Sequence, residues 1–494
     1  MNKIKLNNIK GLYVHVPFCK AKCAYCDFYS LALKSKLEIT SWLDALELEA
    51  KFWRGLAGGK LKINTLYIGG GTPSILDLNE WQRLIKIILS LCDLNNLSEA
   101  SVEANPSSLT LNKDLLKFWR ENFITRVSFG VQSLNDQELK ILGRIHDAKM
   151  ALSALDLIIN SGLNANADLI FAIPNQDLRS WSKSLKLIIN AGVTHISAYN
   201  LTLEPDTPLG KIYSEQDLPN GYKFYRYAQW LLPKKNFAQY EISNFALKNF
   251  ECLHNKLYWN QENVLALGPA ASGYIDGLRY KNPESLSEYY KNLNNFKNFE
   301  PENFLNCEAE RDKFLNYKNY EAEKNFREPE SENFLNCGAE RDKFLNYKNY
   351  EAEKNFREPE LENFCEAERD KFLNYKNYKA DKNFSGAEPE NFSEAECDKN
   401  FKAKDLYLKN IFASAEVLDL KAKAVECAIL NLRTREGINK VNFINKFGEY
   451  LFNKVKNILL GLPENLLIIN DESLALSPAG MRVGNAVWTE LMDL

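Results

Sequence analysis

Six short runs of strand-forming residues recur along the first two-fifths of the chain. They are GLYVHVP (11–17), NTLYIGG (64–70), EASVEAN (99–105), ITRVSFGVQ (124–132), NADLIFAIP (166–174) and VTHISAYNL (193–201). Their wealth of Val, Ile, Tyr and Phe and their few charges are typical of strands that are buried on both faces of a parallel sheet. Helical patterns separate them, for example at 79–92 and 147–162. Alternating strands and helices predict βαβ units and an α/β fold.

Six such units favour an open, partial (β/α)6 barrel of the TIM type over a closed barrel of eight strands. A doubly wound parallel sheet is the alternative that the pattern leaves open. The full chain of 494 residues is long enough for two or three domains.

The composition changes near residue 297. Nearly identical units occupy 302–330 and 332–360, and shortened or decayed copies follow from Glu362 and from about Glu390. We interpret 297–401 as a tandem-repeat insertion that is helical or disordered and solvated. Each copy carries one cysteine, and metal binding by these four is the weaker alternative because their spacing is unlike that of zinc ligands. They are Cys307, Cys337, Cys365 and Cys397.

The residues after the repeats regain helical periodicity at 424–451, and 466–492 indicates a small hairpin followed by a final helix. This order predicts a small C-terminal α+β domain of winged-helix-like character. We therefore expect four parts. They are a barrel at 1–235, a segment that packs on it at 236–296, the repeats at 297–401 and the C-terminal domain at 402–494.

The net charge of −3 supplies no field that would attract nucleic acid or an acidic membrane. The first residues lack the apolar core of a signal peptide, and no run approaches the ~18 uncharged apolar residues of a membrane span. We expect a cytoplasmic protein without a membrane anchor of its own, whose thiols stay reduced.

Three cysteines lie close together directly after the first strand, with the spacing C-x3-C-x2-C: Cys19, Cys23 and Cys26. A structural zinc site normally has four protein ligands. An iron–sulfur cluster that has only three protein ligands would leave one iron open for a substrate or cofactor. Zinc with a remote fourth ligand, such as His15 or His146, is an alternative, and three incidental cysteines are another.

This cysteine motif, with the aromatic Tyr25 just before the last cysteine, resembles the signature of the radical SAM superfamily. The resemblance implies a [4Fe–4S] cluster that the three cysteines hold. It also implies S-adenosylmethionine on the fourth iron, where one electron cleaves that molecule to a 5′-deoxyadenosyl radical.

Polar motifs follow the other strands at their carboxyl ends, where barrel enzymes build their sites. GGGTPS (69–74) follows the second strand, and its glycines would let a ligand approach the backbone closely. The resemblance assigns nine residues to S-adenosylmethionine. They are Tyr13, Tyr25, Gly70, Gly71, Thr72, Glu103, Gln132, Arg144 and Asp168.

The order of these motifs resembles the oxygen-independent coproporphyrinogen III oxidase-like group, over about 11–290 and 410–494. Within that group, YEISNFA (240–246) and CLHNKLYW (252–259) resemble the HemW-type heme chaperones, and LRTREGI (432–438) resembles the group's C-terminal domain. The H-N-x2-Y-W motif would then bind heme through His254, Asn255, Tyr258 and Trp259. Without the family, a lone histidine beside aromatic residues is more often a packed, hydrogen-bonded residue.

The resemblance implies a protein that binds heme and transfers it to apo-hemoproteins such as respiratory cytochromes. It further implies a reductant protein for the cluster and a homodimer. Because the sequence shows no anchor, we expect membrane contact only through partners. It leaves cleavage of S-adenosylmethionine open and assigns no catalytic residue.

The alternative function is a radical enzyme of the oxidase type, which decarboxylates the propionates of a porphyrinogen. The oxidase has a further cysteine where this chain has Phe28, and it lacks the H-N-x2-Y-W motif. Both differences disfavour coproporphyrinogen dehydrogenase activity.

Overall fold

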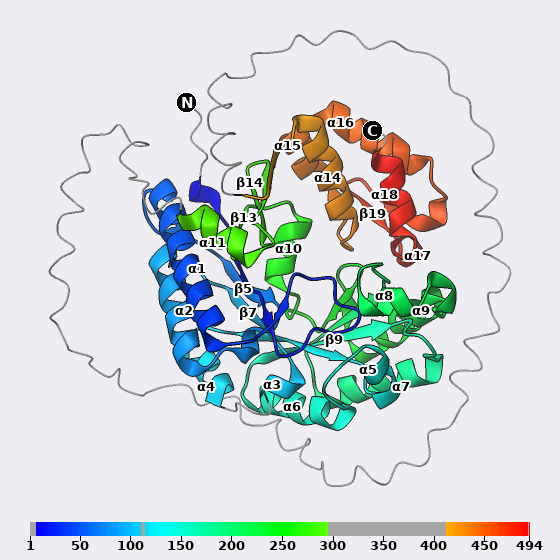
Figure 1. Ribbon diagram of the computed structural model, residues 1–494. Helices are drawn as coiled ribbons and strands as arrows, with labels where there is room; N and C mark the ends of the chain where they lie inside the picture. The colour runs from blue at the N-terminus through cyan, green and yellow to red at the C-terminus, as the bar shows by residue number, and fades with distance from the viewer. Residues whose placement is uncertain (1–5, 110–113, 295–411, 493) are drawn as a thin grey trace, which may run out of the picture. The chain divides into compact units, whose positions relative to one another are not determined.

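The computed structural model describes residues 6–109, 114–294, 412–492 and 494 (Figure 1). The strands are β1 Gly11–Val16, β2 Phe18–Cys19, β3 Leu31–Ala32, β4 Leu61–Lys62, β5 Thr65–Gly70, β6 Cys92–Asp93, β7 Glu99–Ala104, β8 Arg126–Gln132, β9 Asn164–Phe171, β10 His195–Asn200, β11 Ala238–Gln239, β12 Asn244–Ala246, β13 Val264–Leu267, β14 Ser272–Ile275, β15 Leu278–Lys281, β16 Ser414–Val417, β17 Ile438–Asn439, β18 Leu467–Ile469 and β19 Ser473–Leu476. The helices are α1 Lys36–Ala57, α2 Leu78–Leu91, α3 Pro106–Leu109, α4 Asp114–Glu121, α5 Asp136–Ile141, α6 Ala148–Asn160, α7 Leu178–Ala191, α8 Pro208–Ile212, α9 Gly221–Leu231, α10 Leu253–Trp259, α11 Leu286–Asn294, α14 Leu420–Leu432, α15 Lys440–Phe447, α16 Glu449–Leu460, α17 Pro478–Met481 and α18 Gly484–Met492.

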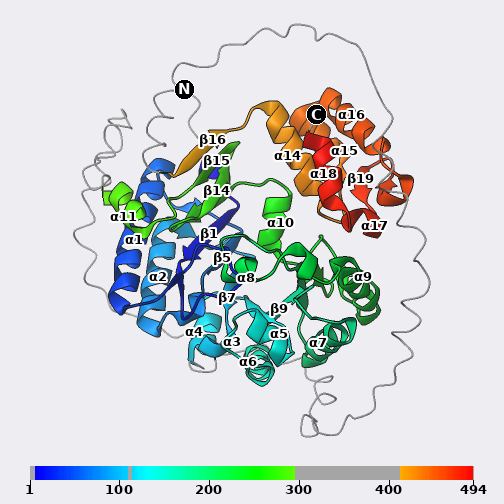
Figure 2. The same ribbon diagram turned by 45° about the vertical axis from the view of Figure 1, so that its right-hand side comes forward.

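The six predicted strands are confirmed as β1, β5, β7, β8, β9 and β10, and they lie in the sheet in this same order. Each pairs in parallel with the next. A doubly wound sheet would reverse its strand order at a switch point, and this sheet does not. The partial α/β barrel is therefore confirmed, and Figure 2 shows α1, α2, α6 and α7 along its outer side.

The two faces of the barrel sheet differ in chemistry, because successive side chains along a strand point to opposite faces. One face is apolar and includes Leu12, Ile68 and Val102, which are fully buried. The other face carries polar residues that are in register or hydrogen-bonded across the strands, such as Tyr67 with Glu103 and Ser128 with Asp168. Ser101, Ser128 and Asn166 of this polar inner face are buried as well, so the expected burial of the strands on both faces is confirmed. That face holds the polar groups that a ligand would need.

Local capping sets where the predicted helices begin. Asp77 accepts a hydrogen bond from the backbone N–H of Glu80, and the Glu80 side chain accepts one from the backbone of Asp77, so α2 begins at Leu78. Asp147 accepts from the backbone N–H of Met150 and starts α6 in the same way. These two helices match the predicted ranges 79–92 and 147–162 to within two residues at each end.

The sheet extends beyond the barrel at both edges. β13 pairs in parallel with the free edge of β1, and β14, β15 and β16 continue from it as antiparallel strands. At the other edge, β12 and β11 add to β10. In the described part of the chain this makes one sheet of 12 strands.

Helix α1 anchors the chain on both sides of the segment 295–411. On one side, the Tyr289 hydroxyl of α11 donates to the buried carboxylate of Glu49 at 2.7 Å. On the other side, the Phe412 ring stacks on the Trp53 ring with a centroid distance of 6.0 Å, and β16 then pairs with β15. Glu49 and Trp53 are one helical turn apart.

The C-terminal residues form helices α14–α16, a three-stranded sheet in the order β17-β19-β18, and helix α18. The predicted hairpin and final helix are confirmed as β18–β19 and α18. The helical stretch expected at 424–451 is interrupted after Leu432, because Gly437 has a φ of +68° and β17 follows it. Leu432, Val455 and Val487 are fully buried where these elements pack together.

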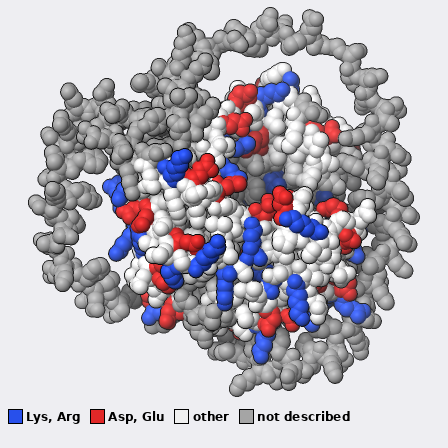
Figure 3. Space-filling view, in the orientation of Figure 1, with Lys and Arg blue, Asp and Glu red and all other residues white. Residues whose placement is uncertain are grey.

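The whole predicted segment 297–401, with its repeat units and their four cysteines, lies outside the described residues, and the boundaries between the four parts stay predictions. Among the helices of the described ranges, none combines the length and apolar character that would span a bilayer. The face seen in Figure 3 carries Lys and Arg interspersed with Asp and Glu.

Candidate functional site

The three cysteines of the motif lie on one connection. Cys19 ends β2, whereas Cys23 and Cys26 lie in the loop between β2 and β3, and all three are free thiols. The Thr72 hydroxyl donates to Cys19 Sγ at 3.4 Å, and Arg144 Nη1 donates to Cys23 Sγ at 3.1 Å. Burial raises the pKa of Cys19 and of Cys26. Hydrogen-bond donors and a cation beside the sulfur atoms favour their thiolate form.

Arg144 connects the thiol loop to two neighbouring strands. Its Nη2 donates to Asn105 Oδ1 at 2.6 Å and to the carbonyl oxygen of Gly130 at 2.8 Å. Asn105 Nδ2 in turn donates to the Thr72 hydroxyl at 2.8 Å. A cavity of about 250 Å³ opens beside this chain of contacts. Its lining includes Lys20, Cys23, Thr72, Ser74, Asn105 and Arg144.

Among the described residues, no group of three or more His, Cys, Asp or Glu side chains is arranged to hold a metal ion. The donor set of the loop nevertheless fits an iron–sulfur cluster, because one connection presents three sulfurs and Thr72 and Arg144 donate toward two of them. Cys19, Cys23 and Cys26 would hold the cluster. A bound cluster would supply single-electron chemistry at this place.

The histidines that would complete a zinc site are engaged elsewhere. His15 Nδ1 lies 2.9 Å from the Tyr13 hydroxyl, and His15 Nε2 lies 2.9 Å from the carbonyl oxygen of Tyr29. His146 Nε2 lies 3.2 Å from the carbonyl oxygen of Val131. Burial lowers the pKa of both imidazoles to about 4.

The glycine motif lies where the backbone approaches its neighbours closely. Gly70 has a φ of +110°, and a Cβ atom there would come within 2.6 Å of the His15 ring. A Cβ on Gly71 would come within 2.6 Å of the carbonyl oxygen of Phe18, the residue before the first cysteine. A side chain at Gly70 would therefore displace the His15 ring of β1, and one at Gly71 would push the backbone before Cys19 away.

Two carboxylates lie on the polar face, Glu103 near the carboxyl end of β7 and Asp168 in the middle of β9. Glu103 accepts from the Tyr67 hydroxyl and from the backbone N–H of Gly70, each at 3.0 Å. Burial, and then the charge of Asp168, raise the pKa of Glu103 to about 7. Burial also raises the pKa of Asp168, which accepts from Ser128 and from Asn166. A cationic ligand, such as the ammonium and sulfonium groups of S-adenosylmethionine, would stabilise both ionised carboxylates.

The raised pKa of Glu103 gives a pH prediction. Below pH 7 the carboxyl is mostly neutral, and above it the ionised form attracts the cationic ligand. Affinity for S-adenosylmethionine should therefore rise about tenfold between pH 6 and pH 8. Calorimetric titration of the reconstituted protein with S-adenosylmethionine at both pH values measures this change in affinity. Glu103→Gln should remove most of the pH dependence. Glu49→Gln is the control, because burial also raises the pKa of Glu49 to about 7 but its side chain binds Gly268, Asn282 and Tyr289. The same pH dependence in Glu103→Gln would contradict the prediction.

The other residues that we expected to contact S-adenosylmethionine lie in three different surroundings. The ring of Tyr13 stacks on that of Tyr67 on the polar face, with centroids 6.2 Å apart. Gln132 ends β8 with a φ of +66°, a strained backbone conformation of the kind that gathers at functional sites. Tyr25 instead packs against an apolar cluster that includes Leu142 and Leu209.

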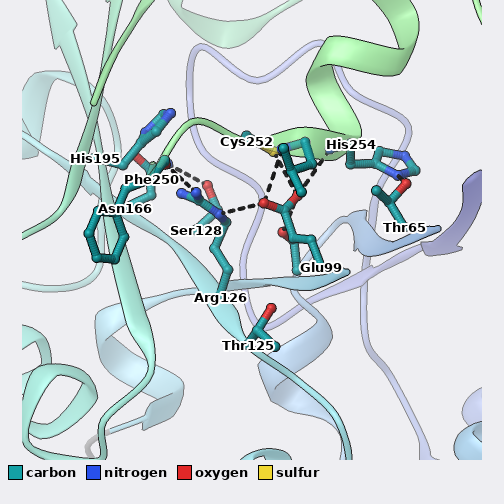
Figure 4. Close-up of polar contacts among 12 residues, drawn as sticks. Thr65, Glu99, Thr125, Arg126, Ser128, Asn166, His195, Phe250, Cys252 and His254 are labelled. Atoms are coloured by element: carbon teal, nitrogen blue, oxygen red, sulfur yellow. Dashed lines mark hydrogen bonds and ion pairs between the residues drawn. The ribbon is translucent and has the colours of Figure 1, made fainter. Parts of the chain in front are cut away.

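The H-N-x2-Y-W motif forms the short helix α10, whose first residues meet a buried ion pair at the amino ends of β7 and β8 (Figure 4). Glu99 accepts from the backbone N–H groups of Leu253 and His254 at 3.0 Å, and from Cys252 Sγ at 3.3 Å. Arg126 Nε donates to Glu99 at 3.3 Å, and its Nη2 donates to the carbonyl oxygen of Phe250.

His254 is fully buried with both ring nitrogens engaged. Nδ1 lies 2.8 Å from the Thr65 hydroxyl, and Nε2 lies 3.1 Å from the Tyr258 hydroxyl. Burial lowers the pKa of His254 to about 3, so the imidazole is neutral at physiological pH, as a metal ligand must be. Asn255 is half-buried on the same helix, and the Trp259 ring packs on the guanidinium of Arg433.

Two connections join this motif to the polar face of the barrel. The Tyr67 ring lies 5.3 Å from the His254 ring, while the Tyr67 hydroxyl donates to Glu103. In addition, Asn166 contacts both Asp168 and His195. His195 Nε2 lies 2.9 Å from the Tyr240 hydroxyl, which accepts from the backbone N–H of Cys252.

Sequence reasoning missed Asn105, Tyr67, Asn166 and the ion pair of Glu99 with Arg126. Asn105 is the last residue of the quoted run EASVEAN and directly precedes Pro106, where its position near Glu103 could have signalled it. Tyr67 could have been found from its alternation with Gly69 on one face of the second strand. The ion pair left a weaker signal in the sequence. It consisted of one acidic residue in the third predicted strand and one basic residue in the fourth.

The sequential parallel strands and the loop of three thiols together define a radical SAM protein. In agreement, the model of the Radical SAM superfamily matches residues 13–188. The heme chaperone HemW of Buchnera aphidicola subsp. Schizaphis graminum is 32% identical over 317 residues, which cover 64% of this chain and 79% of that protein. The heme chaperone HemW of Haemophilus influenzae is 37% identical over 272 residues, which cover 54% of this chain and 70% of that protein. The chain therefore belongs to the HemW heme chaperone family of the radical SAM superfamily.

Coproporphyrinogen III oxidase (HemN) from Escherichia coli, described as a radical SAM enzyme, is a similar solved structure. It has a TM-score of 0.67 and 16% identity, and the likeness covers 98% of this chain and 90% of that one. At this identity the likeness concerns the fold alone.

Proposed function

We propose that this protein is a heme chaperone, which binds heme and transfers it to apo-hemoproteins. The observation that carries the proposal is the placement of the H-N-x2-Y-W motif. Its helix α10 is fixed by Glu99, and its histidine packs on Tyr67, which also contacts Glu103 of the expected cofactor site. One side chain thus lies between the expected heme residues and the expected S-adenosylmethionine residues.

His254 is the axial ligand in this proposal, and Asn255, Tyr258 and Trp259 line the heme. Nε2 would exchange the Tyr258 hydroxyl for the iron, since the two atoms are 3.1 Å apart and Nδ1 keeps its contact with Thr65. A second contact to the other ring nitrogen orients a metal-bound imidazole and fixes its tautomer. The Tyr258 ring meets the imidazole edge-on and could then turn toward the porphyrin.

The cluster and S-adenosylmethionine belong to the same protein, and their residues are Cys19, Cys23 and Cys26 together with the polar face of the barrel. A reductant protein supplies the electron for the cluster. We further propose that the heme acceptors are respiratory cytochromes, that the protein acts in the cytoplasm as a homodimer, and that it meets membranes only through partners.

Replacing His254 with Ala should weaken heme binding at least about tenfold and shift the Soret band, because the iron loses its nitrogen ligand. The measurement is an anaerobic heme titration of the reconstituted full chain. Added imidazole should restore the band by entering the space left by the side chain. His146→Ala is the control, since that imidazole lies away from the H-N-x2-Y-W motif and contacts the carbonyl oxygen of Val131. An unchanged band and affinity in His254→Ala would remove this residue from the heme site.

The oxidase alternative is tested separately with coproporphyrinogen III. A vinyl-bearing product formed under reducing conditions with S-adenosylmethionine would support the enzyme. Tight heme binding without such a product would support the chaperone.

A further inference from the structure

Arg433, in the C-terminal motif LRTREGI, is held between two tryptophans. Its guanidinium carbon lies 4.6 Å from the ring centroid of Trp259, the last residue of the H-N-x2-Y-W motif, and 5.0 Å from that of Trp488 in α18. Such stacking restricts the planar guanidinium and leaves its N–H edge free to bind. The arginine therefore lies directly beside one of the expected heme residues.

The guanidinium makes no hydrogen bond and no ion pair with any residue that the structure describes. Its Nε is buried without a partner, and the same holds for the indole nitrogens of Trp259 and Trp488. Three unpartnered N–H donors thus gather at one place. Buried donors of this kind cost free energy unless an acceptor meets them.

The neighbourhood of Arg433 contains one further unpartnered group. Glu241 is fully buried, and one of its carboxylate oxygens has no hydrogen-bond partner, while the other accepts from the backbone N–H of Ser243. Other cations near the motif are already paired. Lys256 contacts Glu436 at 3.6 Å, and Lys446 donates to the carbonyl oxygen of Asn260. Burial raises the pKa of Glu241 to about 7 and the charge of Arg433 lowers it, so these two groups interact electrostatically. No hydrogen bond or ion pair joins them within the described residues, so the N–H groups of the guanidinium stay available to an acceptor.

The backbone of Arg433, in contrast, is fixed. Its carbonyl oxygen accepts from the N–H of Ile242 at 3.0 Å, and the N–H of Arg435 donates to the carbonyl oxygen of Tyr240. The side chain thus projects from a rigid strand-like contact between LRTREGI and YEISNFA. Replacing the side chain leaves that contact in place.

We infer that Arg433 binds a propionate carboxylate of the tetrapyrrole, with the indoles of Trp259 and Trp488 holding the guanidinium in position. A guanidinium and a carboxylate match in a two-point, charge-assisted contact. A porphyrin seated on the H-N-x2-Y-W motif would contact Trp259 and bring its propionate edge to this arginine. The inference rests on the proposed heme function and names the group that recognises the acidic edge of the ligand.

The test compares heme with heme dimethyl ester, whose propionates carry no charge. The reconstituted full-length wild type should bind heme about 10- to 100-fold more tightly than the ester. In Arg433→Met the affinities for heme and for the ester should differ by no more than about twofold. The ester already lacks the contact that the variant removes, so only heme binding weakens. Arg482→Met is the matched control. That arginine also lies over an aromatic ring, Tyr222, but its Nη1 donates to Gln229.

The outcomes are distinguishable. No binding of heme or ester by the wild type would overturn the proposed function itself. Equal affinity of the wild type for heme and ester would overturn the propionate contact without any variant, and so would an undiminished ratio in Arg433→Met. Loss of the ratio in Arg433→Met but not in Arg482→Met supports the inference. Arg433→Lys, which keeps the charge but not the planar fork, should retain a ratio between those of wild type and Arg433→Met.

Discussion

Replacing Cys23 with Ser is expected to abolish assembly of the iron–sulfur cluster. A neutral hydroxyl is a poor substitute for a thiolate, and only two protein ligands would remain. Bound iron after anaerobic reconstitution should fall at least about tenfold, together with the visible sulfur-to-iron absorption. Cys23 is the informative position, because Arg144 donates to its sulfur and also holds Asn105 and Gly130.

Cys92→Ser is the control for this experiment. Cys92 is a buried thiol in β6, which pairs with β4 just before β5 and β7 begin, so it lies toward the opposite end of the strands from the thiol loop. Its iron content should equal that of the wild type. Wild-type iron and absorption in Cys23→Ser would contradict the assignment of this cysteine to the cluster.

Replacing Arg126 with Met should lower the free energy of unfolding by about 3–5 kcal/mol, the usual cost of breaking a buried ion pair. Arg126 is 3% exposed and Glu99 is 5% exposed, so the variant leaves a carboxylate without its cation inside the protein. It also removes the contact to the carbonyl oxygen of Phe250 just before α10. Urea unfolding, followed by circular dichroism, measures the change.

Lys51→Met provides the comparison for Arg126→Met. Lys51 pairs with Glu47 at 2.9 Å on the exposed side of α1, where such pairs contribute about 0–1 kcal/mol. Heme titration of the folded Arg126 variant adds a functional readout, because the ion pair positions the first turn of the motif helix. A loss of stability no larger than that of Lys51→Met would show that water screens the pair after all.

The local parts of this fold could be predicted from the sequence. Each barrel strand is a contiguous run, and the polar motifs follow the strands, so their meeting at one edge of the sheet follows from parallel pairing alone. The cluster loop needed only the spacing of Cys19, Cys23 and Cys26. Capping residues such as Asp77 fixed the starts of helices within a residue or two.

The parts that escaped prediction depend on contacts between distant positions. β1 pairs with β13, and the ion pair of Glu99 and Arg126 receives a helix from beyond residue 250. No local pattern specifies such partners. Tyr67 taken alone gives no functional signal in the sequence, because its hydroxyl matters only once Glu103 lies beside it. For His254 the sequence allowed both a packed ring and an axial ligand, and the structure describes the neutral, hydrogen-bonded ring from which ligation would have to start.

The anchoring of both flanks of the segment 295–411 on helix α1 has an evolutionary consequence. Tyr289 before the segment and Phe412 after it meet side chains one turn apart, so the fold closes without regard to what the chain does between them. The side chains that they meet both belong to helix α1, so these contacts do not depend on the number of residues between Tyr289 and Phe412. Tandem duplication at this point therefore leaves the contacts of Tyr289 and Phe412 unchanged. The near-identical copies at 302–330 and 332–360 are the outcome expected where selection on length is weak.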